Sequence, residues 1–202
     1  MEHFYEGIET GFELEASAPY SLNYLIFVQN IHLNNENIYK ESPLFPYVDS
    51  STWGILKEEF KKTFIEVWGE VVNKNSQNGF YDHSGVFDID KALFQKLFEN
   101  DEKGIFGYVE SVKTFLAWWN GIYGRIAIEK VFDDYTTNEV YKELSASLNV
   151  NKRLRINLIY DKPLLAGYSE RSWYVVLPIE DIFIPYKIPE IVPKLLKCCE
   201  VI

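Results

Sequence analysis

Two short segments with a two-residue hydrophobic period, one near each end of the chain, constrain the fold most. Between residues 12 and 16, apolar side chains alternate with Glu13 and Glu15, and a similar alternation runs from 154 to 160. This period is typical of a β-strand that buries one face. Residues 23–30 and 173–179 are rich in the residue types that favour strands. We predict that 23–30 forms a hairpin with the first strand.

Helical periodicity occupies most of the chain between these strands. Apolar residues recur at steps of three and four from Trp53 to Val71, with Lys and Glu on the other positions. This pattern predicts an amphipathic helix, with Ser50 or Ser51 as its N-cap. Further helices are predicted over about 88–100, 107–120 and 136–148, and from Pro189 onward. Residues 122–132 fit either a helix or a strand.

Helices that lie between strand pairs favour an α+β fold. We therefore predict a mixed or antiparallel sheet of about four to six strands, packed against several amphipathic helices. No linker or low-complexity tract divides the 202 residues, and 47% of them are hydrophobic. The sequence thus predicts a single globular domain over residues 1–202.

The sequence also predicts a cytoplasmic protein. Its longest apolar runs fall far short of the roughly 20 residues that cross a bilayer. The first fifteen residues contain five Glu and no Lys or Arg, the reverse of the basic segment that opens a secretory signal. The two cysteines, Cys198 and Cys199, are neighbours, and a disulfide between neighbours is strained, so we expect reduced thiols.

The strongest functional signal is the distribution of charge. Asp and Glu outnumber Lys and Arg by 30 to 20, which disfavours binding to nucleic acid or to an anionic membrane. The whole excess lies in residues 1–101, with 7 basic against 17 acidic residues, whereas residues 102–202 hold 13 of each. Clustered charge of one sign speeds the capture of an oppositely charged partner.

The first predicted strand places this charge on one face. If that face is exposed, it forms an acidic strip with aromatic residues beside it, and the candidate partner-binding residues are Glu9, Glu13, Glu15, Tyr20 and Tyr24. The alternative is that the strip is solvated without a partner, or that the acids pair with Arg153 and Arg155 across the sheet. The exposed strip would suit a basic protein partner. We therefore predict a non-catalytic cytosolic binding protein, for example an immunity protein that neutralises a nuclease-type toxin.

The alternative function is an enzyme of hydrolase-like type. Asp82, His83 and Ser84 supply an acid, an imidazole and a hydroxyl, the groups of nucleophilic catalysis. Neighbouring side chains of an extended segment point to opposite faces, however, so this cluster is more typical of a turn. The catalytic alternative needs a pocket around Asp82 and His83. Phosphate-binding glycine motifs and metal-ligand spacings do not occur in the sequence, so no cofactor or metal is predicted.

Overall fold

The fold is described from a computed structural model, which describes residues 3–6, 11–38, 41–79, 81–131, 134–183 and 187–200. The chain forms two compact units. Unit 1 comprises residues 1–19, 122–162 and 168–202, and unit 2 comprises 20–121 and 163–167. In the sequence, unit 2 is thus an insertion after the first strands of unit 1. The prediction of one domain over residues 1–202 stays a prediction.

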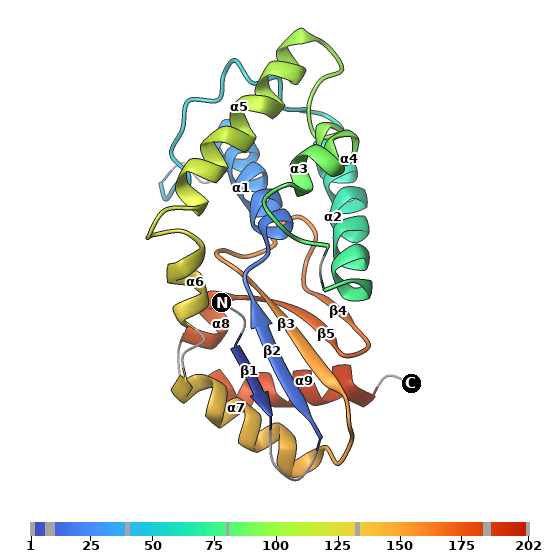
Figure 1. The fold of residues 1–202 in the computed structure, drawn as a ribbon. Helices are drawn as coiled ribbons and strands as arrows, with labels where there is room; N and C mark the ends of the chain where they lie inside the picture. Colours follow the sequence, from blue (N-terminus) through green and yellow to red (C-terminus); the bar gives the residue numbers. More distant parts are fainter. Residues whose placement is uncertain are drawn as a thin grey trace. The chain divides into compact units, whose positions relative to one another are not determined.

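Unit 1 is built on a five-stranded mixed sheet (Figure 1). Its strands, in the order β1-β2-β3-β5-β4 across the sheet, are β1 (His3–Glu6), β2 (Glu13–Ser17), β3 (Arg153–Ile159), β5 (Tyr174–Pro178) and β4 (Ser169–Arg171). The inner pairs β2–β3 and β3–β5 are parallel, and the two outer pairs are antiparallel. This confirms the predicted α+β class with a mixed sheet, and it confirms the strands predicted near 12–16, 154–160 and 173–179.

The helices of unit 1 are α6 (Arg125–Val131), α7 (Asp134–Ser147), α8 (Ile179–Phe183) and α9 (Ile188–Glu200). Helix α7 packs against α9, and α9 packs against β5, passing behind the sheet in Figure 1. The apolar row of the sheet, with Leu14, Ile156 and Val175, is buried. The sequence of residues 122–132 fits either a helix or a strand, and the structure shows that residues 125–131 form a helix.

Unit 2 is helical. Its helices are α1 (Tyr20–Asn35), α2 (Phe60–Gln77), α3 (Val86–Ile89), α4 (Lys91–Gln95) and α5 (Glu102–Trp119). Helix α1 contacts α2, α3 and α5, and it is buried on every side from Ser21 to Leu33 (Figure 1). The ring of Tyr24 lies edge-on to three phenylalanines at centroid distances of 4.9 to 5.6 Å, and its hydroxyl is 2.7 Å from Ser111 Oγ. Helix α1 is therefore the centre of this core.

Two sequence-based predictions in unit 2 are wrong. Residues 23–30, predicted as a strand in a hairpin, belong to α1. A helix that is buried all round has no polar face, so its apolar run lacks a helical period. The helix predicted from Ser50 or Ser51 begins only at Phe60. Residues before it form a loop, in which Ile55 makes a β-bridge with Phe98.

The acidic excess does not divide between the units as it does between the halves of the sequence. Unit 1 carries 11 Lys and Arg against 16 Asp and Glu, and unit 2 carries 9 against 14, so each has a net charge of −5. The reason is topological. The acid-rich strands β1 and β2 share a sheet with the more basic C-terminal segments. The asymmetry along the sequence therefore does not create one acidic unit.

Candidate functional site

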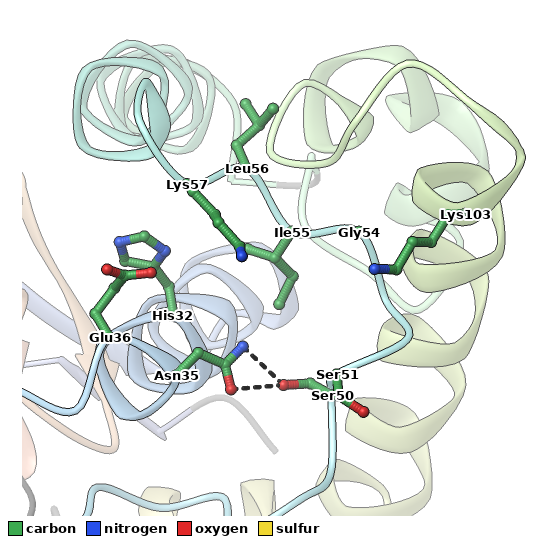
Figure 2. A pocket seen from close by; sticks show the side chains of 10 residues that line it. All are labelled: His32, Asn35, Glu36, Ser50, Ser51, Gly54, Ile55, Leu56, Lys57 and Lys103. Carbon is green, nitrogen blue, oxygen red and sulfur yellow. Dashed lines mark hydrogen bonds between the residues drawn. The ribbon is translucent and has the colours of Figure 1, made fainter.

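A pocket of about 300 Å³ in unit 2 gathers side chains from three separate segments (Figure 2). The last turns of α1 contribute one wall, the loop 50–57 a second, and the first turn of α5 a third. The residues that line this pocket are His32, Asn35, Glu36, Ser50, Ser51, Gly54, Ile55, Leu56, Lys57 and Lys103. We call it the His32 pocket.

The loop wall is held by backbone hydrogen bonds to the segment that precedes α5. Leu56 N donates to Leu97 O at 3.1 Å, and Glu99 N donates to Gly54 O at 2.7 Å. Gly54 has a φ of +56°, a conformation that glycine adopts without the steric cost of a side chain. These bonds fix the loop as a short extended pair, so the wall has a defined geometry.

Gly107 of α5 allows the same loop to approach the helix. A Cβ atom at this position would lie 1.6 Å from the carbonyl oxygen of Trp53. No side chain larger than hydrogen fits at that distance unless the backbone moves. The pocket therefore depends on a glycine that faces the loop from within a helix.

His32 brings a buried imidazole to the pocket. Its ring stacks on Phe60 at a centroid distance of 3.9 Å and an angle of 12°, and the residue is 8% exposed. Burial lowers the pKa of His32, while nearby Glu36 and a hydrogen bond to the Leu56 backbone act in the opposite direction. The ring is thus mainly neutral near pH 7, with one nitrogen engaged by the backbone.

Two lysines bring positive charge to the same space. Lys57 comes from the loop and Lys103 from α5, and Figure 2 shows both amino groups directed inward. Within the described part of the chain, neither amino group makes an ion pair. Glu36 is the acidic residue among those lining the pocket, so the lining carries a formal net charge of +1. This sign is opposite to that of the whole chain.

The remaining polar side chains are partly used within the protein. Asn35 and Ser50 hydrogen-bond one another, with Nδ2 and Oδ1 of the amide 2.9 and 3.0 Å from the Ser50 hydroxyl (Figure 2). The backbone N–H of Ser51 donates to Asp49 at 3.0 Å. The groups left to contact a ligand are therefore the two amino groups, the Glu36 carboxylate and the imidazole edge. They suit an anionic molecule that also offers a hydrogen-bond donor.

The acidic residues predicted to form an exposed strip are paired instead. Arg153 Nε lies 2.5 Å from Glu13 Oε2, and Arg153 Nη1 lies 3.1 Å from Glu15 Oε2. The register of the parallel pair β2–β3 sets Glu13 beside Arg153 and Glu15 beside Arg155. Glu15 is only 9% exposed. The alternative that the sequence left open, pairing across the sheet, is the one observed, and this face is not an open acidic strip.

The other predicted partner-binding residues are Tyr20, Tyr24 and Glu9. Tyr24 is buried in the core of unit 2, because residues 23–30 are helical. Tyr20 is the first residue of α1, and its hydroxyl donates to Asn120 Oδ1 at 2.9 Å. Glu9 lies outside the described residues. The burial of Tyr24 removes it from any binding surface.

Asp82 and His83 occupy a turn before α3. The Asp82 carboxylate accepts hydrogen bonds from the backbone N–H groups of Tyr20 and Ser21, the latter at 2.8 Å, and so caps the start of α1. The His83 side chain is exposed, and its Nδ1 accepts from Gly85 N at 3.0 Å. Neither residue lines the His32 pocket. These contacts give Asp82 a structural role, because its carboxylate satisfies backbone N–H groups at the start of α1.

Sequence reasoning missed the His32 pocket. The lining residues are spread along the sequence from His32 to Lys103, which are 71 positions apart, and they form no motif. One signal was present: His32 is a lone titratable residue at the end of an apolar run.

Comparison with protein-family models, curated proteins and solved structures gave no match, so the site has to be interpreted from its own chemistry. Across the residues that the structure describes, no group of three or more His, Cys, Asp or Glu side chains is arranged to hold a metal ion. No described helix combines the length and the apolar character needed to span a bilayer.

Proposed function

We propose that the protein binds a small organic anion in the His32 pocket. The observation that carries this proposal is the convergence of Lys57 and Lys103, from separate elements, on one cavity without an ion pair to any described residue. The whole chain has a net charge of −10, so this cavity is a local region of positive charge on an acidic protein. Two unpaired lysines that face the same cavity attract an anionic ligand.

The remaining lining narrows the ligand. A cavity of about 300 Å³ lies at the small end of the range for ligand sites, which favours a molecule of metabolite size. Glu36 would accept a hydrogen bond from a ligand hydroxyl or amine. Phosphorylated or dicarboxylate molecules that also carry such a donor match this combination, and the neutral imidazole supplies a further hydrogen-bonding edge.

The test is a titration of the full chain with inorganic phosphate, glycerol phosphate and succinate, followed by NMR. We expect saturable shifts at the pocket for at least one of these anions. Loss of one lysine in Lys57→Gln or Lys103→Gln should weaken binding about tenfold, because a hydrogen bond to a charged group is worth about 1.5 kcal/mol.

The matched control is Lys61→Gln, on α2, which removes the same charge from a residue that does not line the pocket. Its affinity should equal that of the unmodified chain. If none of the three anions binds saturably, or if binding is unchanged in the Lys57→Gln/Lys103→Gln double variant, the proposal is wrong.

A second candidate function is the binding of a basic protein partner, which the charge of the sequence predicts. A different surface now favours it: Ile122, Tyr123 and Ile126 are 76%, 85% and 47% exposed within five residues. Clusters of exposed large apolar side chains mark interaction sites, and aromatic residues are common among binding hot spots. The net charge of −5 on each unit would favour a basic partner such as a nuclease-type toxin.

This candidate is tested by co-purification from the protein's own cell extract at rising salt. A basic partner that is retained at low salt, released at high salt and lost with Tyr123→Ser supports the candidate. The candidate is contradicted if a basic protein is retained equally at low and high salt and also by the Tyr123→Ser variant. It is also contradicted if no basic protein is retained at all.

A further inference from the structure

Unit 1 contains a second cavity, of about 260 Å³, beside the edge of its sheet. It lies between β4 and β5 on one side and α9 on the other, with α8 at one end. The lining residues are Tyr168, Ser169, Glu170, Val175, Val176, Leu177, Asp181, Ile191, Lys194 and Lys197. We call it the α9 pocket.

The floor of the α9 pocket is apolar. Val175 and Leu177 come from β5, and Ile191 comes from α9. Strand β4, which is only three residues long, lies at the edge of the sheet and contributes Ser169 and Glu170 to the lining. The His32 pocket, by contrast, is dominated by polar side chains. The two cavities therefore suit ligands of different chemistry.

Two lysines of α9 stand at the mouth of the α9 pocket. Lys194 and Lys197 are three residues apart, which places them on the same face of the helix. Lys194 Nζ lies 5.8 Å from the centroid of the Tyr168 ring. Neither lysine makes an ion pair with any residue that the structure describes. Both amino groups are thus available to a ligand.

Two acidic residues also line this pocket. Asp181 lies 3.5 Å from Lys187 Nζ, and Glu170 Oε2 accepts from Cys198 Sγ at 3.4 Å. Burial, together with Glu170, raises the pKa of Cys198 to about 12, so the sulfur stays a thiol and adds no charge. Glu170 keeps its negative charge, because a hydrogen bond from a thiol does not neutralise a carboxylate. Since Lys187 offsets Asp181, the two lysines of α9 outweigh Glu170 and leave a formal net charge of +1.

We propose that the α9 pocket binds a small amphiphilic carboxylate, whose apolar chain lies on Val175, Leu177 and Ile191 and whose head group contacts Lys194 and Lys197. The length of a medium-chain fatty acid such as octanoate suits a cavity of this volume. Burial of the chain supplies most of the affinity, at about 25 cal/mol per Å² of apolar surface, and the lysines select the head group.

The test compares octanoate, octanol and octylammonium, which share a chain and differ in charge, by calorimetric titration of the protein of residues 1–202. We expect saturable binding of octanoate, about tenfold weaker binding of octanol, and still weaker binding of octylammonium. In the Lys194→Glu/Lys197→Glu variant the order should reverse, with octylammonium bound best. Both side chains are exposed, so the variant should fold.

Lys142→Glu, on the exposed part of α7, reverses the charge of one lysine away from the pocket and should leave the order unchanged. The proposal is overturned if octanoate does not bind saturably, if the three compounds bind alike, or if the charge-reversal variant keeps the original order. The Lys57→Gln/Lys103→Gln variant should bind octanoate normally, so this result is independent of the anion site in unit 2.

Discussion

Unit 1 and unit 2 use clustered charge in opposite ways. In unit 1, Arg153 contacts both Glu13 and Glu15, so these three charges are paired with one another. In unit 2, Lys57 and Lys103 converge on a cavity, and neither makes an ion pair with a described residue. The first arrangement joins β3 to β2 through residue pairs that are 140 positions apart (Arg153 and Glu13) and 138 positions apart (Arg153 and Glu15) in the sequence. The second leaves charge available to a ligand.

This difference shows why charge in a sequence is a poor guide to a binding surface. The glutamates of β2 are the most conspicuous acidic residues near the start of the chain, yet they form ion pairs with Arg153 inside the fold. The lysines of the His32 pocket are inconspicuous among the 20 basic residues. A charged residue indicates binding only when the fold leaves it without a partner and beside a cavity.

The largest expected effect comes from Gly107→Ala. This variant tests whether the His32 pocket needs the close approach of its loop wall to Gly107 of α5. The added methyl group would meet the Trp53 carbonyl at 1.6 Å, so the loop has to move. We expect a loss of about 3 kcal/mol in the free energy of unfolding, measured by urea denaturation, together with loss of anion binding. Gly69→Ala, where the new Cβ has no atom within 4 Å, should instead stabilise α2 by about 0.5–1 kcal/mol. Equal stability of the two variants would contradict this account.

The next effect is a pH dependence of stability that arises in the same pocket. Burial lowers the pKa of His32 below its usual 6.5, so below that pH the unfolded chain binds a proton that the folded chain does not. The free energy of unfolding should therefore fall as pH decreases below about 6.5, by up to about 1.4 kcal/mol per pH unit from this residue. In His32→Gln this contribution should vanish. A pH profile with an unchanged slope in the variant would exclude His32 as its source.

Arg153→Gln tests the paired side of the comparison. Without the guanidinium, the largely buried Glu15 loses its ion pair, and we expect a loss of about 1 kcal/mol because solvent already screens the half-exposed Arg153. The Glu15→Gln/Arg153→Gln double variant should recover part of it. Neither variant should alter anion binding in unit 2. A loss of anion affinity would mean that the two charge clusters are not independent.

The smallest effect on stability is expected for the unpaired lysines. The Lys57→Gln/Lys103→Gln variant should unfold within about 0.5 kcal/mol of the unmodified chain, because it breaks no ion pair within the described residues. Its anion affinity should nevertheless fall steeply. A large loss of stability, measured by the same urea denaturation, would show that these lysines hold the fold together and would weaken the contrast with Arg153.

Local patterns predicted the elements that have one buried and one exposed face. The alternation around Glu13 and Glu15 gave β2, and the three-and-four spacing before Val71 gave most of α2. The same reasoning failed for α1, since a helix enclosed by other helices carries apolar residues on every side. It also began α2 too early, because Trp53 and Leu56 are apolar for a different reason: they pack in the loop beside α5.

The sequence by itself determined the α+β class, the position of most helices and strands, and the net charge, because each of these depends on residues within a few positions of one another. Only the tertiary structure decided which charges are paired and which face a cavity. Arg153 meets Glu13 through the register of two parallel strands, and Lys103 meets His32 through the packing of α5 and the loop against α1. Such contacts join residues far apart in the chain, so no local period or spacing records them.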